Sequence, residues 1–275
     1  MKQTSARRRL LLASALTLLA GCAEPPPGPP PLLRAAARQT RAGEAAYLTG
    51  HADEAVPALA ESVHLHLAAG DTPGACRALL NLALAERGAG DAKAAGATAR
   101  QLRGLAPAAR QQAAEAGAVS EADAASAWLD ALLALDQGDS AAAASLLAGA
   151  PAGFAKASPW PGRLETLRAE IALGQGRFAE ALAHAQAGRT SCAAAHDQSE
   201  EARALRLAGS ARIGLGKWLE ARADFLAAVH LEELLGGGAR MAGDLDHLAT
   251  IAEHLGDREG ARLYTQRARA IAGEH

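Results

Sequence analysis

Aromatic side chains are scarce in this sequence of 275 residues. Phe, Trp and Tyr make up 3% of it, although 49% of the residues are hydrophobic. The apolar content is therefore mostly Ala and Leu, and roughly a quarter of the chain is Ala, the strongest helix former and a poor strand residue. This composition disfavours a β-sandwich, a β-barrel and a module that stacks sugars or bases on aromatic rings. It predicts a helical protein.

The short motifs that mark many enzymes are also missing. The sequence has no His-Glu-x-x-His, no Cys-x-x-Cys, no phosphate-binding Gly loop and no Gly-x-Ser-x-Gly. The best metal candidate is the pair His247 and His254, which share a helix face with Asp244 and Asp246 nearby. Solvated faces of terminal helices have the same pattern. We therefore predict no catalytic residues, no resident metal and no cofactor.

Cysteine is rare as well. Of the three cysteines, Cys22 lies near the N-terminus, which leaves Cys76 and Cys192 far apart in the sequence. A disulfide needs Cα atoms within about 7 Å of each other. In the repeat arrangement described below, several stacked helices separate Cys76 from Cys192. We therefore predict two free, mostly buried thiols.

The N-terminus lacks an apolar run long enough to span a bilayer. Basic residues (Lys2, Arg7, Arg8 and Arg9) precede an apolar stretch of only ten residues, 10–19. A basic start, a short apolar core and then small residues are typical of an export signal rather than of a membrane-spanning helix. Residues 1–21 are therefore predicted to be a signal peptide.

The signal ends in Leu19-Ala20-Gly21-Cys22, which resembles the lipobox of bacterial lipoproteins. The resemblance implies that the chain is cut before Cys22 and that this residue is acylated. Several acyl chains hold a protein to a membrane without a transmembrane helix. Ala23, rather than Asp, follows the cysteine, which in the lipoprotein sorting scheme implies the outer membrane.

The segment after the signal is rich in proline and carries little charge. Residues 22–31 hold six prolines, favour polyproline II and form a predicted stalk on the order of 20 Å long. Without residues 1–21 the chain has 24 basic and 30 acidic residues, a net charge of −6. This charge disfavours a nucleic-acid partner, and because no polybasic patch follows Cys22, the acyl chains alone would contact the membrane.

One phrase recurs along residues 32–273: a Gly is followed five residues later by Ala. It occurs at Gly50 with Ala55, Gly90 with Ala95, Gly138 with Ala143, Gly176 with Ala181, Gly216 with Ala221 and Gly256 with Ala261. The intervals are 40, 48, 38, 40 and 40 residues, and a fixed period of this size indicates a solenoid. Ala/Leu-rich runs on both sides of each Gly predict a pair of helices per unit. The Gly suits a left-handed helix end, and the acidic residue that often follows it can cap the next helix.

Two further positions resemble the tetratricopeptide repeat family. A small residue lies seven before each turn glycine: Gly43, Ala83, Ala131, Ala169, Gly209 and Ala249. Three units also have a large residue four after the recurring Ala: Leu59, Leu147 and Phe225. The resemblance implies an all-α, right-handed α-hairpin solenoid of about six repeats, whose first helices line a concave groove. The period is not the usual 34, and an Ala-rich bundle without regular stacking is the alternative.

The groove face of the first helices can be followed at steps of three and four residues. It gives ten candidate binding residues: Arg77, Leu80, Leu84, Arg87, Trp128, Leu132, Arg163, Glu170, Arg203 and Arg206. Arginines beside a Trp and Leu patch would clamp the carboxylates and apolar anchors of a peptide. The alternative is that they are solvated helix residues whose stems cover apolar neighbours. The Pro/Gly-rich loop 149–162, with Phe154 and Trp160, is a second candidate contact unless the next helix covers its rings.

Together these patterns predict a lipid-anchored periplasmic repeat protein without enzymatic activity. Its partner would be a protein segment held in the groove, and its role that of an adaptor in the assembly of cell-envelope complexes. Two other hypotheses stay open. One is an envelope lipoprotein that binds a small ligand or glycan, and the other is a helical metal-dependent hydrolase.

Overall fold

The structure, a computed structural model, describes residues 30–118, 120–151, 154, 157–236 and 238–273. These residues form twelve helices and no strand. The helices pair into six consecutive hairpins: α2 (Pro31–Leu48) with α3 (Ala52–Ala68), α4 (Thr72–Gly88) with α5 (Ala92–Glu115), α6 (Ala122–Asp136) with α7 (Ser140–Ala148), α8 (Trp160–Gly174) with α9 (Phe178–Ala195), α10 (Gln198–Gly214) with α11 (Trp218–Leu235), and α12 (Gly238–His254) with α13 (Arg258–Ala272). The prediction of an all-α solenoid of about six helical hairpins is confirmed.

All six turn glycines adopt the left-handed conformation expected at the end of a helix. Their φ angles are +87° at Gly50, +83° at Gly90, +79° at Gly138, +71° at Gly176, +73° at Gly216 and +79° at Gly256. Where Asp follows the glycine, its side chain accepts a hydrogen bond from a backbone N–H in the first turn of the next helix, as at Asp91, Asp139 and Asp257. The predicted capping role of the acidic residue is therefore confirmed in these three hairpins, whereas the N-cap residues His51, Arg177 and Lys217 of the other three second helices make no side-chain cap hydrogen bond.

Close approach of the two helices depends on matched side-chain sizes. The recurring alanines of the second helices are almost fully buried, and Ala55 and Ala221 have no exposed surface. A methyl group added to Gly209 would lie 2.7 Å from Cε2 of Phe225, which is far too close for a carbon–carbon contact. Gly43 faces Leu59 in the same way, and there the distance would be 2.5 Å. A glycine thus stands opposite a large residue in these two hairpins.

Two hairpins depart from the regular pattern. The residues that lengthen the second interval extend α5 to 24 residues, and Pro107 lies inside this helix rather than at its end. In the third hairpin α7 has 9 residues, and the connection to α8 ends at Trp160, the first residue of that helix. The predicted loop 149–162 is therefore shorter than expected, and four of its residues, 152–153 and 155–156, lie outside the described part of the chain.

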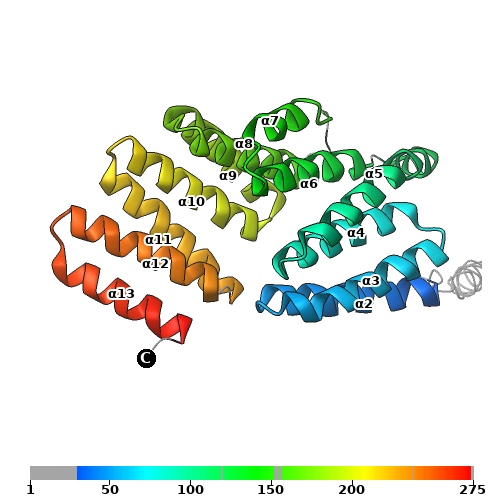
Figure 1. Cartoon of the computed structure of the whole chain (residues 1–275), viewed down its shortest axis with the longest axis horizontal. Helices are drawn as coiled ribbons and strands as arrows, with labels where there is room; N and C mark the ends of the chain where they lie inside the picture. The colour runs from blue at the N-terminus through cyan, green and yellow to red at the C-terminus, as the bar shows by residue number, and fades with distance from the viewer. Residues whose placement is uncertain (1–29, 119, 152–153, 155–156, 237, 274–275) are drawn as a thin grey trace, which may run out of the picture.

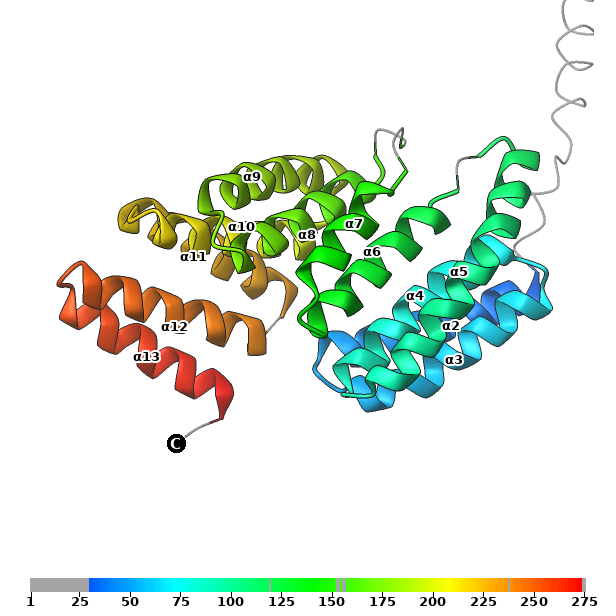
Figure 2. The same cartoon turned by 45° about the horizontal axis from the view of Figure 1, so that its top comes forward.

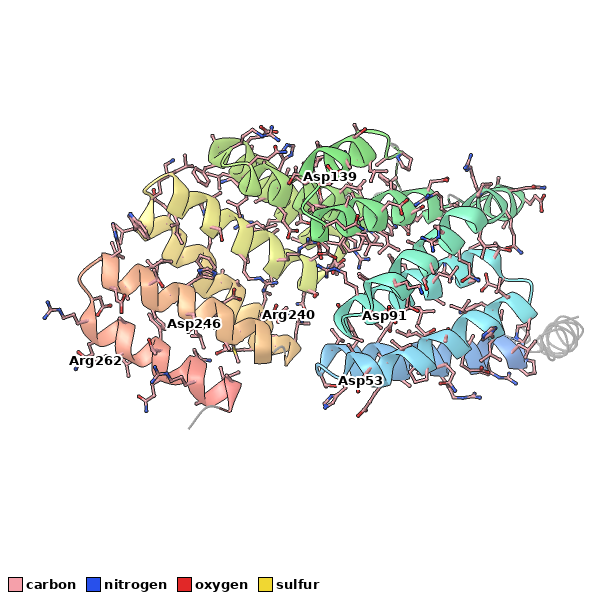
Figure 3. The ribbon with its side chains drawn as sticks, viewed as in Figure 1. Asp53, Asp91, Asp139, Arg240, Asp246 and Arg262 are labelled. Carbon is pink, nitrogen blue, oxygen red and sulfur yellow. The ribbon has the colours of Figure 1, made fainter. Side chains whose placement is uncertain are left out.

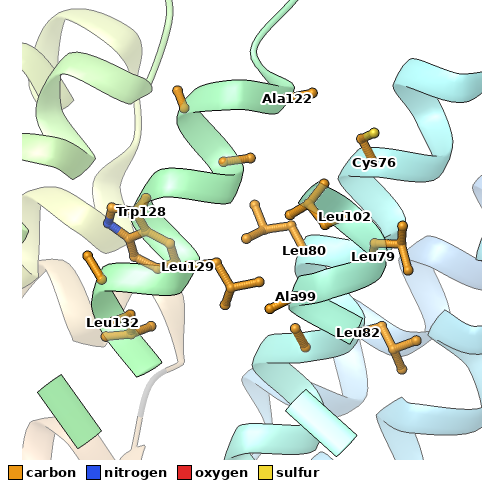
Figure 4. Packing of buried hydrophobic residues seen from close by; sticks show 14 of the residues in the cluster. Cys76, Leu79, Leu80, Leu82, Ala99, Leu102, Ala122, Trp128, Leu129 and Leu132 are labelled. Carbon is orange, nitrogen blue, oxygen red and sulfur yellow. The ribbon is translucent and has the colours of Figure 1, made fainter. Parts of the chain in front are cut away.

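The rings of this region belong to the core. Trp128 and Trp160 pack edge to face, with ring centroids 6.3 Å apart and planes at 71°, and they are 5% and 4% exposed. Phe154 is half-buried and packs against the same cluster. Figure 4 shows the neighbouring packing, with Leu129 of α6 directed towards Leu80 across the gap between the second and third hairpins. Trp160 is the first residue of α8 itself, and Trp128 of the earlier helix α6 packs against its ring.

Successive hairpins stack so that the first helices line the inner side of a curved molecule (Figures 1 and 2). Contacts link α2 to α4, α4 to α6, α6 to α8 and α8 to α10. The first and last hairpins lie at opposite ends of the view in Figure 1. In the described residues no helix is long and apolar enough to cross a membrane. The predicted signal peptide, acylated Cys22 and stalk comprise residues 1–31, of which 1–29 lie outside the described part of the chain.

The two remaining cysteines are buried, as predicted, and neither forms a disulfide in the described part of the chain. Burial raises the pKa of Cys76 to about 11 and that of Cys192 to about 12. Both are therefore thiols rather than thiolates at neutral pH, and they behave as small apolar core residues.

Candidate functional site

A groove with a volume of about 450 Å³ runs along the concave side of the solenoid. The first helix of every hairpin contributes to it, from Leu48 on α2 to Arg240 on α12. The first and last hairpins thus line the same hollow, because the stack of hairpins is curved. We call this hollow the central groove.

Eight of the ten predicted binding residues line the central groove: Leu84, Arg87, Trp128, Leu132, Arg163, Glu170, Arg203 and Arg206. The other two, Arg77 and Leu80, line an adjoining hollow of about 860 Å³ between α2, α4 and α6. The two hollows share Glu44, Asn81 and Arg163. The structure therefore places all ten residues on the concave side.

The apolar members of this set contribute less surface than the sequence suggests. Trp128, Leu132 and Leu80 are 5%, 4% and 5% exposed, so only their edges reach the hollows. The indole Nε1–H of Trp128 donates to the backbone oxygen of Arg163 at 3.1 Å. The expectation of an open Trp and Leu patch is corrected, because these side chains hold the second, third and fourth hairpins together.

The accessible apolar surface of the central groove lies on the first hairpin instead. Leu48 is 51% exposed and lines the groove beside half-buried Tyr47 and Leu84. Sequence reasoning did not single out Tyr47 and Leu48, because the groove face was traced from the second hairpin onward. The repeat pattern could have found them, since they lie four and five residues after Gly43, the small position of the first repeat.

Four of the five predicted groove arginines already hold carboxylates. Arg87 donates to Asp136 through Nε at 2.5 Å and Nη2 at 2.7 Å, and this hydrogen bonding raises the pKa of Arg87. Arg163 donates to Asp197 Oδ2 at 3.0 Å through Nε and at 2.9 Å through Nη2. Each pair joins one hairpin to the next. Arg77 is exposed and makes no ion pair with a residue that the structure describes.

Arg203 is the centre of a pair network that joins α8 and α10. It donates to Glu200 Oε1 at 2.6 Å and also pairs with Glu170 on the preceding first helix, α8. Thr166 donates to the same Glu200 oxygen at 2.8 Å. Burial disfavours the charge on Glu200, but Arg203 and the Thr166 hydrogen bond outweigh burial and lower its pKa. Burial likewise disfavours the charge on Arg203, and its two carboxylates raise its pKa above the ordinary value.

The C-terminal end of the groove holds two buried carboxylates. Glu232 has no exposed surface and accepts from Arg206 Nη1 at 2.9 Å and from Arg240 Nε at 3.0 Å. Asp244, 1% exposed, is 3.4 Å from Arg206, and its Oδ1 has no partner among the described residues. Burial raises the pKa of Asp244 to about 6. Arg206 therefore serves two carboxylates that it cannot neutralise fully.

These pairs change the expected role of the groove arginines. A guanidinium that is bonded to a carboxylate of its own chain is not free to clamp one from a partner, and breaking the pair would leave a buried charge behind. The central groove thus has its exposed apolar side chains near α2 and α4, beside Glu44, Asn81 and the paired Arg87, and is lined by ion-paired arginines near α8, α10 and α12.

The two histidines of the predicted metal candidate, His247 and His254, stack on aromatic rings. The His247 ring stacks on Phe225 with centroids 4.8 Å apart, and that of His254 stacks on Trp218 at 3.7 Å. Burial lowers the pKa of His247. Within the described residues no three His, Cys, Asp or Glu side chains come close enough to hold a metal ion.

Comparisons with known proteins support the fold. No protein-family model and no curated protein matches the sequence. Among solved structures the chain is similar to BtubC (BKLC) from P. vanneervenii, with a TM-score of 0.59, 16% identity and coverage of 89% of this chain and 92% of that one. It is also similar to PilW, described as a widely conserved type IV pilus biogenesis factor, with a TM-score of 0.51, 18% identity and coverage of 86% and 92%. The chain has the fold of a tetratricopeptide-like helical solenoid.

Proposed function

We propose that this protein is a scaffold that holds a segment of a partner protein in the central groove. The observation that carries the proposal is the groove itself, which every first helix lines and whose N-terminal end exposes Tyr47, Leu48 and Leu84. A concave, largely preformed site with an apolar end and a polar end suits one segment bound by one or two apolar anchors. No covalent step is involved.

Because most groove arginines are already paired, they limit the kinds of side chain through which a partner segment can bind. An apolar side chain of the segment would lie on the first and second hairpins, while its polar part would follow the ion pairs of α8 and α10 through hydrogen bonds. Of the predicted arginines, Arg77 in the adjoining hollow remains available for a partner carboxylate, and Arg41 lines the same hollow. The other nine predicted residues would act by shaping the groove.

We also propose that the protein acts in the bacterial cell envelope, anchored through acylated Cys22 and facing the periplasm from the outer membrane. The sequence Leu19-Ala20-Gly21-Cys22 and the proline-rich residues 22–31 support this proposal. The likeness to PilW, a pilus biogenesis factor, is in keeping with a role in assembling an envelope complex. Cys22→Ser should move the protein from the membrane fraction to the soluble fraction and abolish incorporation of labelled palmitate.

The groove is tested with two matched leucine variants of the full chain. Leu48, in the groove, is 51% exposed, and Leu219, at the start of α11, does not line it and is 63% exposed. Leu48→Glu and Leu219→Glu thus place the same charge on similarly exposed helix positions. Each variant is used to purify partners from envelope extract, and the bound proteins are quantified by mass spectrometry.

We expect Leu48→Glu to lose the proteins that the wild type retains and Leu219→Glu to keep them, with circular dichroism unchanged for both. If both variants retain the same proteins as the wild type, or if Leu219→Glu alone loses them, the groove is not the binding surface.

A further inference from the structure

The last helix carries a row of arginines that the groove hypothesis does not use. Arg258, Arg262 and Arg269 are exposed and lie at steps of four and seven residues, which places them on one face of α13. We call this face the α13 arginine strip. It borders a hollow of about 590 Å³ whose other lining residues include Thr265, Gln266 and one carboxylate, Glu253.

The strip differs from its surroundings because its charges are not neutralised. None of the three arginines makes an ion pair with a carboxylate in the described part of the chain, although Glu253 lines the same hollow. On another face of the same helix, Arg267 pairs with Glu233. The three arginines thus form a cationic row that makes no ion pair with a described residue, although Asp257 and Glu259 flank Arg258 in the sequence.

The position of the strip leaves it open to a partner. Within the described residues α13 packs against α12, and Arg258, Arg262 and Arg269 are on its exposed side. Arg262 lies at the outer end of the molecule, away from the N-terminal hairpins and from the central groove (Figure 3). Ala261 and Ala270 are small, so a partner can approach the helix between the guanidinium groups.

We propose that the α13 arginine strip is a second interaction surface, which binds an acidic segment of a partner protein. The distance along the helix from Arg258 to Arg269 is about 17 Å, at 1.5 Å per residue. A partner helix with carboxylates at the same spacing would match it, and each arginine can hold a carboxylate through two hydrogen bonds. Gln266 adds a side-chain donor within the row.

A protein segment fits these observations better than a lipid surface or a nucleic acid. A narrow hollow that holds three arginines, a Thr and a Gln can follow one chain. The acidic balance of the whole protein, 30 Asp and Glu against 28 Lys and Arg, opposes binding to an extended polyanion. The strip also lies on the hairpin farthest along the chain from the proposed anchor at Cys22.

The first helix supplies a matched control. Arg34, Arg38 and Arg41 on α2 are exposed at steps of four and three residues and also make no ion pair with a described residue, although Arg41 lines the hollow that adjoins the central groove. The experiment compares R258Q/R262Q/R269Q with R34Q/R38Q/R41Q in the full chain, so both variants lose the same charge. Gln keeps the helix propensity of Arg and does not create a new acidic surface.

The probe is a synthetic helical peptide with Glu at positions i, i+4 and i+11, compared with the same peptide carrying Gln, by fluorescence anisotropy at low and high salt. We expect the wild type and the α2 variant to bind the Glu peptide about tenfold more tightly than the α13 variant does, because three exposed ion pairs contribute modestly each. High salt should weaken this binding, and Leu48→Glu should leave it unchanged, which separates it from the central groove.

Three results would overturn the proposal. One is equal binding of the Glu and Gln peptides by the wild type. Another is an equal loss in the α2 and α13 variants, which would indicate net charge rather than a site. The third is stronger retention of the wild type than of the α13 variant on phosphatidylglycerol vesicles without any peptide binding, which would assign the strip to a lipid surface.

Discussion

Arginine has different roles on two surfaces of this molecule, the central groove and the α13 arginine strip. In the central groove Arg163, Arg203 and Arg206 each bind carboxylates from neighbouring helices, and their exposed fractions are 29%, 21% and 22%. On α13, Arg258 and Arg262 are exposed and make no ion pair with a carboxylate in the part of the chain that the structure describes. The same residue type is therefore part of the framework in one region and free to bind in the other.

The difference teaches that the number of arginines on a face does not reveal a binding site. Apart from Glu200, which lies on the same helix as Arg203, the partners of the groove arginines are 26 to 49 residues away in sequence, on other helices that folding brings into contact. What decides the role is whether stacking brings a carboxylate within reach. The following predictions test this distinction, in order of decreasing effect.

The largest effect is expected from Arg206→Ala. The substitution leaves Asp244 buried without an ion-pair partner and removes one of two partners of Glu232. Because an uncompensated buried charge is costly, the free energy of unfolding should fall by about 3 kcal/mol. Arg262→Ala, on the strip, should change it by less than about 0.5 kcal/mol. Urea denaturation measures the free energy of unfolding of both variants. Equal losses would contradict the distinction between groove and strip arginines.

The second prediction concerns pH. The pKa of Asp244 is about 6 in the folded protein, above its ordinary value of 3.8, because burial disfavours the charge. Between these pH values the folded state binds more protons than the unfolded state, so this residue lowers stability as pH rises towards 6. Asp244→Asn removes the effect.

The Asn variant should therefore match the wild type near pH 4 and exceed it in free energy of unfolding by about 2 kcal/mol at pH 7. The measurement is urea denaturation of the two proteins across this range. A wild type that is more stable than the variant at pH 7 would show that the Arg206 pair outweighs burial.

The smallest effect is expected at the rim of the groove. Arg87 and Asp136 are 37% and 38% exposed, so solvent screens their attraction. Arg87→Ala should cost about 0.5 to 1 kcal/mol at low salt, and less at high salt. Arg34→Ala, at an unpaired position, should cost nothing measurable at either salt concentration. A loss of several kcal/mol for Arg87→Ala would show that the Arg87–Asp136 pair contributes as much as a buried ion pair.

Much of the fold follows from the sequence because each hairpin repeats the same local rules. Gly216 ends a helix with φ +73°, and Gly209 accepts the ring of Phe225 at close range. The side of the chain that lines the groove also follows, because steps of three and four keep residues on one helix face. These features depend on residues within one hairpin.

Which groove side chains are buried, and which arginines are paired, cannot be predicted from the sequence in the same way. The burial of Trp128 against Trp160 and the pairing of Arg163 with Asp197 depend on how one hairpin sits on the next. The contribution of Leu48 and Arg240 to one groove depends on small rotations that add up over the whole stack. Single-sequence patterns do not contain that geometry.

The most direct test of this account is a pair of double-mutant cycles. The first combines Arg163→Ala with Asp197→Asn, since Asn keeps the acceptor that caps α10. The second combines Arg262→Ala with Glu253→Gln in the hollow beside α13. We predict a coupling free energy of about 1 to 2 kcal/mol for the groove pair and one within about 0.3 kcal/mol of zero for the strip pair. Equal coupling in the two cycles would contradict the division of the arginines into framework and free groups.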